Sequence, residues 1–305
     1  MMNTQKQIVL QKLLNRRSKK KDKNKIGLII EGGGMRGSFS GGVMVGLEKL
    51  GLSDVFDYVY ASSSGSCAGA YFLSHQANFG ASIYYDDLSG YKFIKPWKIN
   101  RAADIDYLCE VIFRQKKILN TKKVANCKTI LKIFVADANN GKCTFYTNKD
   151  KVDIIQAIKA SCALPAFYNK PIKIGSNKYM DGRIEKALPI EDAISDGCSD
   201  VLVVTTVPEY FREIKDNFLS KWVKRVLMSR LPIQYKKKYH NIERHNNYNE
   251  SLDVVFGKIK IHRKINIYTI SPNYMLDKYE TRRGTLIRAI NHGYDQAIET
   301  FSLEK

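Results

Sequence analysis

The sequence predicts an α/β fold, in which helices flank a central, largely parallel sheet. Short apolar runs typical of buried strands recur along the chain, and the segments between them carry apolar residues at helical spacing. When strands and helices alternate in this way, the strands usually pair in parallel and the helices cover the sheet. A chain of 305 residues is long enough for one large domain with a buried site.

The first unit of this fold is predicted as strand, loop, helix and strand. Ile26–Ile30 is an apolar run that ends in a glycine cluster, as expected for a buried strand entering a tight loop. Residues 41–50 follow with helical spacing, 55–61 form a second strand-like run, and small residues in 64–74 indicate a closely packed helix.

The second unit continues the alternation. Residues 130–136 and 144–147 predict strands, and residues 153–161 predict a helix that stops near Pro165. Further expected elements are a hairpin at 170–180, strands at 201–206 and 265–270, and a helix at 285–301.

Composition divides the chain into three parts. We expect a basic N-terminal tail at 1–24, a catalytic domain at 25–210, and a basic, mainly helical extension at 211–305 that packs on the same domain. The amphipathic pattern at 6–25 suits a solvated tail or, as the less favoured alternative, an anionic surface. For the basic stretch at 211–250, a surface-binding element and an ordinary amphipathic helix both stay open.

The net charge of +20 predicts attraction to polyanions such as phospholipid surfaces, although excess lysine also serves solubility. The six cysteines contain no CxxC pair, so neither a zinc site nor a thioredoxin-like motif is expected. At this chain length a disulfide framework is unnecessary, and free thiols are expected. No segment suits a membrane span or a Sec signal. We therefore expect a cytoplasmic protein, with peripheral membrane contact or export without a Sec signal as open alternatives.

Ser63 lies at the predicted strand-to-helix junction, within Ala61-Ser62-Ser63-Ser64-Gly65. A sharp turn there would raise one side chain out of the backbone as a nucleophile. Ser63 has a small residue two places before it and Gly65 two places after it, whereas Ser62 is flanked by Tyr60 and Ser64. The pattern favours Ser63, although serine is also an ordinary turn residue.

A glycine-rich loop, Gly32-Gly33-Gly34-Met35-Arg36-Gly37, precedes this junction. Backbone N–H groups at the start of a helix can stabilise a negatively charged oxygen, so the loop suits an oxyanion hole. The same glycines match a dinucleotide-binding fingerprint, but that fingerprint needs an acidic residue at the end of the next strand, where this chain has serines.

Asp181-Gly182 follows the predicted hairpin, which would present the carboxylate of Asp181. Together with the glycine loop and the serine turn, it resembles the patatin-like phospholipase family. The flanks Ile29-Ile30-Glu31, Cys67 to Ser74 and Ala160 to Pro165 share the resemblance, which extends from about Ile26 to Pro208.

This resemblance implies a layered patatin-like fold and a lipid acyl hydrolase of phospholipase A or lysophospholipase type. Ser63 would attack the ester carbonyl, Asp181 would accept the serine proton, and the loop that includes Gly32, Gly33, Gly34, Arg36 and Gly37 would stabilise the oxyanion. No metal or other cofactor is implied. The expected partners are phospholipid or another acyl lipid and an anionic membrane surface, and no nucleic acid.

Two residues depart from the family pattern. Ala61 replaces the first glycine of the serine motif, and Arg183 replaces the small residue after Asp181-Gly182. We expect the Ala61 methyl group to be tolerated. Arg183 would place a cation beside Asp181, where it would lower the pKa of that carboxylate or narrow the site.

Two alternatives to a Ser-Asp dyad stay open. The first is an ordinary Ser-Asp-His triad, for which residue order permits His240, His245, His262 or His292 as the base. His75 is excluded, because a helix would carry it about 18 Å from Ser63. The second is a non-catalytic membrane-binding protein on a hydrolase scaffold.

Overall fold

The computed structural model describes residues 4–20, 22–95, 97–98, 101–165, 167–214, 231–239, 242–261 and 265–302. Within these residues one sheet has the strand order β5-β6-β3-β2-β1-β7-β8, and β4 pairs with β3 outside this path. The strands are β1 (Ile26–Ile30), β2 (Tyr58–Ala61), β3 (Ile130–Asp137), β4 (Cys143–Thr147), β5 (Ile172–Ile174), β6 (Asn177–Asp181), β7 (Asp200–Val204) and β8 (Asn266–Ile270).

The predicted α/β class and largely parallel sheet are confirmed. Strands β3, β2, β1, β7 and β8 pair in parallel, whereas β4, β5 and β6 add antiparallel pairs at one side. Ile30 lies opposite both Ala61 and Val204, so the central strands end level with one another. Loops that follow these strands therefore meet at one edge of the sheet.

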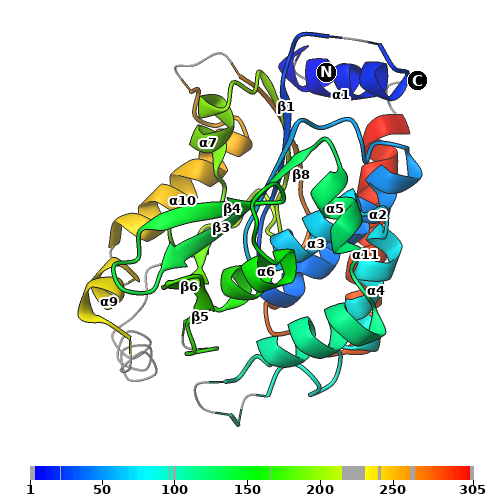
Figure 1. Ribbon diagram of the computed structural model, residues 1–305. Coiled ribbons are helices and arrows are strands. Elements are labelled where there is room, and N and C mark those ends of the chain that lie inside the picture. The colour runs from blue at the N-terminus through cyan, green and yellow to red at the C-terminus, as the bar shows by residue number, and fades with distance from the viewer. Residues whose placement is uncertain are drawn as a thin grey trace.

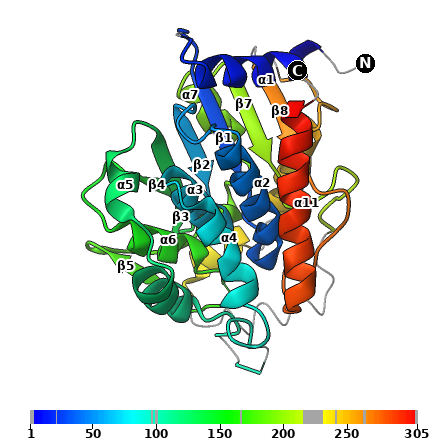
Figure 2. The same ribbon diagram turned by 90° about the vertical axis from the view of Figure 1, so that its right-hand side faces the viewer.

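Helices cover both faces of the sheet, with α2, α3, α4 and α11 on one face and α7 and α10 on the other (Figures 1 and 2). The helices are α1 (Thr4–Arg17), α2 (Gly37–Lys49), α3 (Ser64–Leu73), α4 (Ala77–Asp86), α5 (Thr121–Asn126), α6 (Ile154–Cys162), α7 (Ile190–Ser195), α9 (Ile233–Tyr239), α10 (Ile242–Val255) and α11 (Arg283–Ser302). Shorter or irregular turns are η1 (Gly34–Arg36), η2 (Tyr107–Lys116, with π-helical geometry) and η3 (Gly182–Ile184).

Each central strand contributes to two apolar clusters, one on each face. On β1, Leu28 and Ile30 point into the cluster under α2 and α3, whereas Ile29 joins the cluster under α7 and α10. A strand buried on both faces needs a continuous apolar run, which explains the composition of Ile26–Ile30. On the first face, α2 and α11 can pack closely because Gly42 has no side chain. A Cβ at this position would overlap the backbone of Ile290.

The N-terminal segment differs from a solvated tail. Residues 4–17 form α1, which lies across the end of the sheet where the parallel strands begin (Figure 1). Val9, Leu10 and Leu13 are fully buried, and Lys12 Nζ forms an ion pair of 2.5 Å with the buried Asp200. The apolar side of the amphipathic pattern therefore packs against the protein.

The segment after residue 210 contributes to the same sheet and core. Strand β8 pairs with β7, and α11 packs along α2. Residues 215–230 of the basic stretch at 211–250, which include Lys221, Lys224, Arg225 and Arg230, lie outside the described residues. None of the described helices combines the length and apolar character that crossing a bilayer needs.

Candidate active site

Ser63 occupies a strained turn between β2 and α3. Its backbone has φ 53° and ψ −134°, in the region that side-chain-bearing residues rarely adopt. The turn can lie this close to β1 because Gly65 and Gly32 lack side chains: a Cβ at Gly65 would overlap the carbonyl oxygen of Ile30, and one at Gly32 would overlap that of Ser62. This geometry is typical of a nucleophile elbow.

Ser161, at the end of α6, connects this turn to β3. Its Oγ accepts a hydrogen bond of 2.8 Å from the Ser63 N–H and donates one of 2.7 Å to the carbonyl oxygen of Phe134. In the sequence, Ser161 stood out only as part of a flank shared with the patatin-like family. Its position between Ala160 and Cys162, at the end of a predicted helix, could have indicated a buried serine with hydrogen-bond partners, because a buried hydroxyl needs them.

Asp181 ends β6 and is 1% exposed. Its N–H donates to the carbonyl oxygen of Ala163 at 3.1 Å, and its Oδ1 accepts a 2.8 Å hydrogen bond from the Arg183 N–H. A Cβ at Gly182 would lie 2.5 Å from the Phe134 carbonyl carbon, so the turn lies directly on β3. The hairpin expected to present Asp181 is therefore formed by β5 and β6.

Strand register places the ends of β2 and β6 on opposite sides of β3. Ala61, two residues before Ser63, pairs with Ile133, and Asp181 pairs with Val135. Ser161 connects the Ser63 turn to the same part of β3, because it bonds to the Ser63 N–H and to the carbonyl oxygen of Phe134.

The glycine loop lies beside the serine turn, but several of its N–H groups already have partners. The Gly33 N–H donates to Ser64 Oγ at 2.9 Å, the Arg36 N–H donates to the Gly33 carbonyl, and the Gly37 N–H donates back into η1. Gly34 has φ 61°, and among the described residues no hydrogen bond engages its N–H. Gly34 and Ser63 both line the same pocket.

The side chain of Arg183 turns away from Asp181 towards a buried acid. Its Nη2 lies 3.2 Å from Oε1 of Glu31, and its guanidinium lies over the ring of Tyr248 at 5.0 Å. Glu31 is fully buried and also accepts hydrogen bonds from the N–H and hydroxyl of Thr206 and from the Tyr248 hydroxyl. Arg183 contacts the Asp181 carboxylate through its backbone N–H.

The second arginine of the site, Arg36, supports a neighbouring loop. Its Nε donates to the carbonyl oxygen of Leu276 at 2.9 Å. Burial and the charge of Arg183 lower the pKa of Arg36. Burial alone would also lower the pKa of Arg183, but interactions with Tyr248 and Glu31 outweigh it and raise that pKa above its usual value. The negative charge of Glu31 therefore offsets the positive charges of Arg36 and Arg183 beside the glycine loop.

A mainly apolar pocket opens at Ser63 and extends between α2, α3, α4 and η2. It contains about 920 Å³ not filled by protein atoms, part of which is open to solvent. Tyr71, Tyr84, Leu108 and Phe113 line its interior, and Asp181 lies outside the lining. This shape and chemistry fit an apolar ligand next to the serine.

A family model described as patatin-like phospholipase matches residues 28–194, more than half of the chain. The chain belongs to the patatin-like phospholipase family. The matched range contains the glycine loop, the Ser63 turn and the Asp181 turn. It ends before β7, β8 and α11, so this chain completes the sheet with segments beyond the matched range.

This patatin-like chain is similar to several distant proteins. It is 24% identical over 213 residues to the uncharacterized protein YjjU of Escherichia coli, covering 66% of this chain and 56% of YjjU. Among solved structures, VipD of Legionella pneumophila is 12% identical with a TM-score of 0.49, covering 92% of this chain and 67% of VipD. Pseudomonas aeruginosa ExoU, solved with SpcU, is 12% identical with a TM-score of 0.33, covering 76% and 53%.

The described histidines of this patatin-like chain do not line the pocket. His75 Nε2 lies 3.1 Å from Asp54, and His292 Nε2 accepts a hydrogen bond from the Asn273 N–H. The side chains of His240, His245 and His262 lie outside the described residues. In the part of the chain that the structure covers, no group of three or more potential ligands could hold a metal ion.

Proposed function

We propose that this chain is a lipid acyl hydrolase of phospholipase A or lysophospholipase type, with Ser63 as nucleophile and Asp181 as its base. The observation that carries the proposal is the convergence of Ser63, Ser161 and the Asp181 turn on one short stretch of β3. Membership of a phospholipase family supports the lipid substrate.

In the proposed reaction, Ser63 Oγ attacks the ester carbonyl carbon while Asp181 accepts the hydroxyl proton. The carbonyl oxygen gains the negative charge, which the Gly34 N–H and the adjoining η1 turn stabilise. Collapse of the tetrahedral intermediate expels the alcohol, which takes the proton from Asp181. Water then attacks the acyl-serine and gives a proton to Asp181, and when the second tetrahedral intermediate collapses this proton passes to Ser63 Oγ and the free fatty acid leaves.

The apolar pocket holds the acyl chain in this proposal. Its lining is mostly carbon, and it begins at the nucleophile. Burial of apolar surface contributes about 0.8 kcal/mol per methylene group, so the pocket would favour longer acyl chains over acetyl esters. The polar headgroup would then remain at the solvent side of the Ser63 turn.

The test is fatty-acid release from a mixed phospholipid extract, followed by mass spectrometry. Ser63→Ala should lower release by roughly 10⁴-fold or more, and Asp181→Asn should lower it strongly as well. Ser62→Ala is the matched control. Ser62 directly precedes Ser63 in the chain, and its Oγ has no hydrogen-bond partner among the described residues. Undiminished release by Ser63→Ala would refute the serine mechanism.

Two other proposals are separated by the same assay. A Ser-Asp-His triad would also lose activity in one of His240→Ala, His245→Ala, His262→Ala or His292→Ala, whereas the dyad would keep it in all four. A non-catalytic membrane-binding protein would release no fatty acid at all while still binding vesicles.

We also propose contact with anionic membranes, to which the net charge of +20 is suited. The basic residues Lys19 to Lys21 and Lys221 to Lys238 would contribute long-range attraction. Binding to anionic vesicles should weaken as salt is added, and equal binding to neutral vesicles would contradict this electrostatic contribution.

A further inference from the structure

A hairpin-like segment between α4 and η2 has one side in the pocket and the other in solvent. We call its described residues, 87–95, 97–98 and 101–106, the rim segment. Phe93, Ile94 and Ala103 line the pocket, and Ile94 and Ala103 form a β-bridge. The rim segment is therefore part of the pocket wall and is also an outer surface of the molecule.

The rim segment is fixed to the mouth of the pocket by backbone hydrogen bonds. The Gly90 N–H donates to the carbonyl oxygen of Thr281 at 2.7 Å, and the Ala103 N–H donates to that of Phe167 at 3.1 Å. Phe167 stacks on Tyr279 at 4.9 Å, and both rings line the pocket. Any surface that contacts the outside of the rim segment is thus next to the pocket.

The outer side of the rim segment presents an aromatic pair. Tyr91 and Trp97 are 61% and 62% exposed, and their rings meet edge to face at 5.2 Å. A single exposed aromatic ring is ordinary, but a pair in mutual contact forms an apolar patch. Tyrosine and tryptophan are the residues enriched where a bilayer meets water, because each ring has an apolar body and a polar edge.

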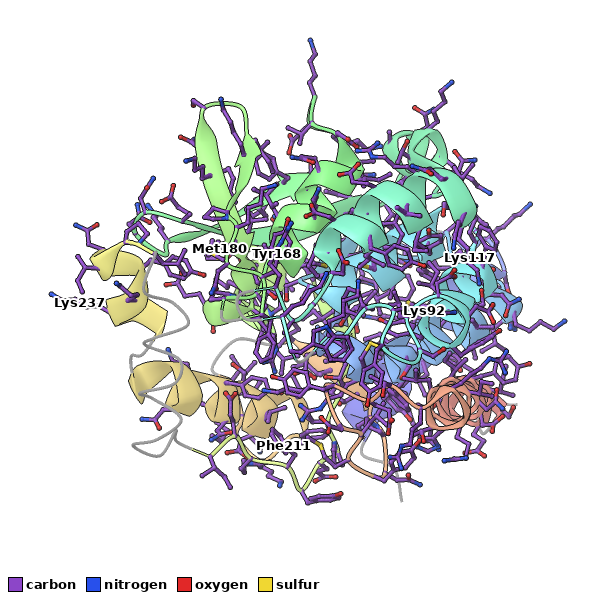
Figure 3. The ribbon with its side chains drawn as sticks, turned by 90° about the horizontal axis from the view of Figure 1, so that it is seen from below. Lys92, Lys117, Tyr168, Met180, Phe211 and Lys237 are labelled. Atoms are coloured by element: carbon purple, nitrogen blue, oxygen red, sulfur yellow. The ribbon has the colours of Figure 1, made fainter. Side chains whose placement is uncertain are left out.

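Cationic residues lie close to this pair in the rim segment. Lys92 and Lys98 are exposed, and Lys92 Nζ donates to the carbonyl oxygen of Asp86 without forming an ion pair to any described carboxylate. Lys95 and Arg101 pair with Asp104 and Asp106. Figure 3 looks onto this end of the molecule, with Lys92 labelled on it. Aromatic rings with adjacent lysines suit the headgroup region of an anionic bilayer.

We propose that the rim segment docks the protein on anionic phospholipid bilayers, with Tyr91 and Trp97 inserted between headgroups and Lys92 and Lys98 on lipid phosphates. This inference deepens the proposed function, on whose lipid substrate it rests, by placing the docking surface at the pocket mouth. A lipid would then move from the bilayer past Phe93 and Ile94 to Ser63 without crossing bulk water.

The first test measures vesicle sedimentation with the full chain carrying Ser63→Ala, so that the lipid is not consumed. Vesicles of phosphatidylcholine mixed with phosphatidylserine should bind well, and phosphatidylcholine alone should bind weakly. Tyr91→Ala with Trp97→Ala should weaken binding by about tenfold or more. Lys92→Gln and Lys98→Gln should each weaken it by about fivefold at low salt.

Ile118→Ala is the matched control for loss of an exposed apolar side chain. Ile118 is 57% exposed, and its carbonyl oxygen bonds to Gln76, at the end of α4 opposite the rim segment. This variant should bind like the parent. Unchanged binding by the Tyr91 and Trp97 variant, or equal loss in Ile118→Ala, would overturn the docking proposal.

The second test uses fluorescence. The chain has two tryptophans, so Trp222→Phe leaves Trp97 as the reporter. Its emission should shift to shorter wavelength on mixing with phosphatidylserine-containing vesicles, since the ring leaves water. An unshifted emission spectrum at vesicle concentrations that sediment the protein would also overturn the proposal.

The third test separates docking from catalysis. The Tyr91 and Trp97 variant should hydrolyse a water-soluble short-chain ester like the parent while losing activity on vesicles. Loss of both activities would show a structural defect and contradict docking. If the parent hydrolyses no ester, the proposed reaction fails, but vesicle binding by the rim segment is still decided by the first two tests.

Discussion

Arg183 is the residue at which this chain departs most from the family pattern. The sequence placed its charge next to Asp181, on the reasonable assumption that neighbours in sequence are neighbours in space. The turn instead directs the guanidinium to Glu31, 152 residues earlier, and leaves the Arg183 N–H on the carboxylate. Because Glu31 is fully buried, its charge needs that partner.

We expect Arg183→Ala to lower the free energy of unfolding by about 2–3 kcal/mol, because it leaves a buried carboxylate without its cation. Glu31→Gln should cost a similar amount. The double variant should cost clearly less than the sum, since no uncompensated charge remains. Urea denaturation of the four proteins measures this coupling.

Lys186→Ala is the control for the Arg183 and Glu31 variants. Its ion pair with Asp192 is at 2.7 Å, but the Lys186 side chain is partly exposed, so its loss should change stability by less than about 1 kcal/mol. Strictly additive costs for Arg183→Ala and Glu31→Gln would show that the two groups do not stabilise each other.

Helix α4 and turn η2 form much of the pocket, yet neither was predicted from the sequence. Apolar residues at 77, 81, 84 and 88 have helical spacing, which was an available signal for α4. The π-helical geometry of η2 could not be read from its residues, because it differs from an α-helix only in hydrogen-bond register. The pocket could therefore not be predicted from the sequence, because it forms where α4 and η2 pack against α2 and α3.

Ala68 tests the pocket formed by these elements. It lies on α3, about one turn beyond the Ser63 elbow, and lines the pocket. Ala68→Phe should shorten the space for an acyl chain, so kcat/KM should fall by about fourfold for each methylene group excluded. A series of esters of increasing chain length measures this. Equal losses for the shortest and longest esters would contradict a role in chain binding.

The contact between α2 and α11 should make stability depend on pH through His292. Its ring packs against Phe39 and Tyr274, and its Nε2 accepts a hydrogen bond from a backbone N–H. Burial lowers the pKa of His292 below its usual 6.5, although Asp295 and Glu299 act in the opposite direction. The unfolded chain therefore binds more protons at mildly acidic pH, and stability should fall as pH drops below about 6.5.

His292→Gln should remove this component. Urea denaturation at about pH 7.5 and about pH 5.5 gives the change in unfolding free energy for each protein, and that change should be smaller in the variant. An identical pH dependence in parent and variant would assign the acid sensitivity to other groups.

For the molecule as a whole, α1 is part of the folded core. Its buried apolar side and its Lys12 to Asp200 ion pair fix it across the start of the strands. The further division into a catalytic domain at 25–210 and an extension at 211–305 remains a prediction. Strand β8 and helix α11 show that the extension shares the sheet and core of the preceding residues.

Leu10→Ala should therefore destabilise the whole fold by about 2–4 kcal/mol, since it removes a fully buried side chain. Ile8→Ala is the control on the same helix: Ile8 is 36% exposed, and its loss should cost about 1 kcal/mol or less. Thermal or urea unfolding measures both. Equal and small effects would indicate that α1 contributes little to stability.

The sequence determined the fold class, the central strands and the family, because these depend on local patterns: apolar runs, glycines where backbones meet, and a serine at a strand end. The tertiary structure decided which distant groups meet. Ser161 under Ser63, Glu31 opposite Arg183 and the rim segment over the pocket each join residues far apart in the chain. Such contacts depend on how whole helices and strands pack together. A local pattern of residues therefore does not show which distant residue each side chain will contact.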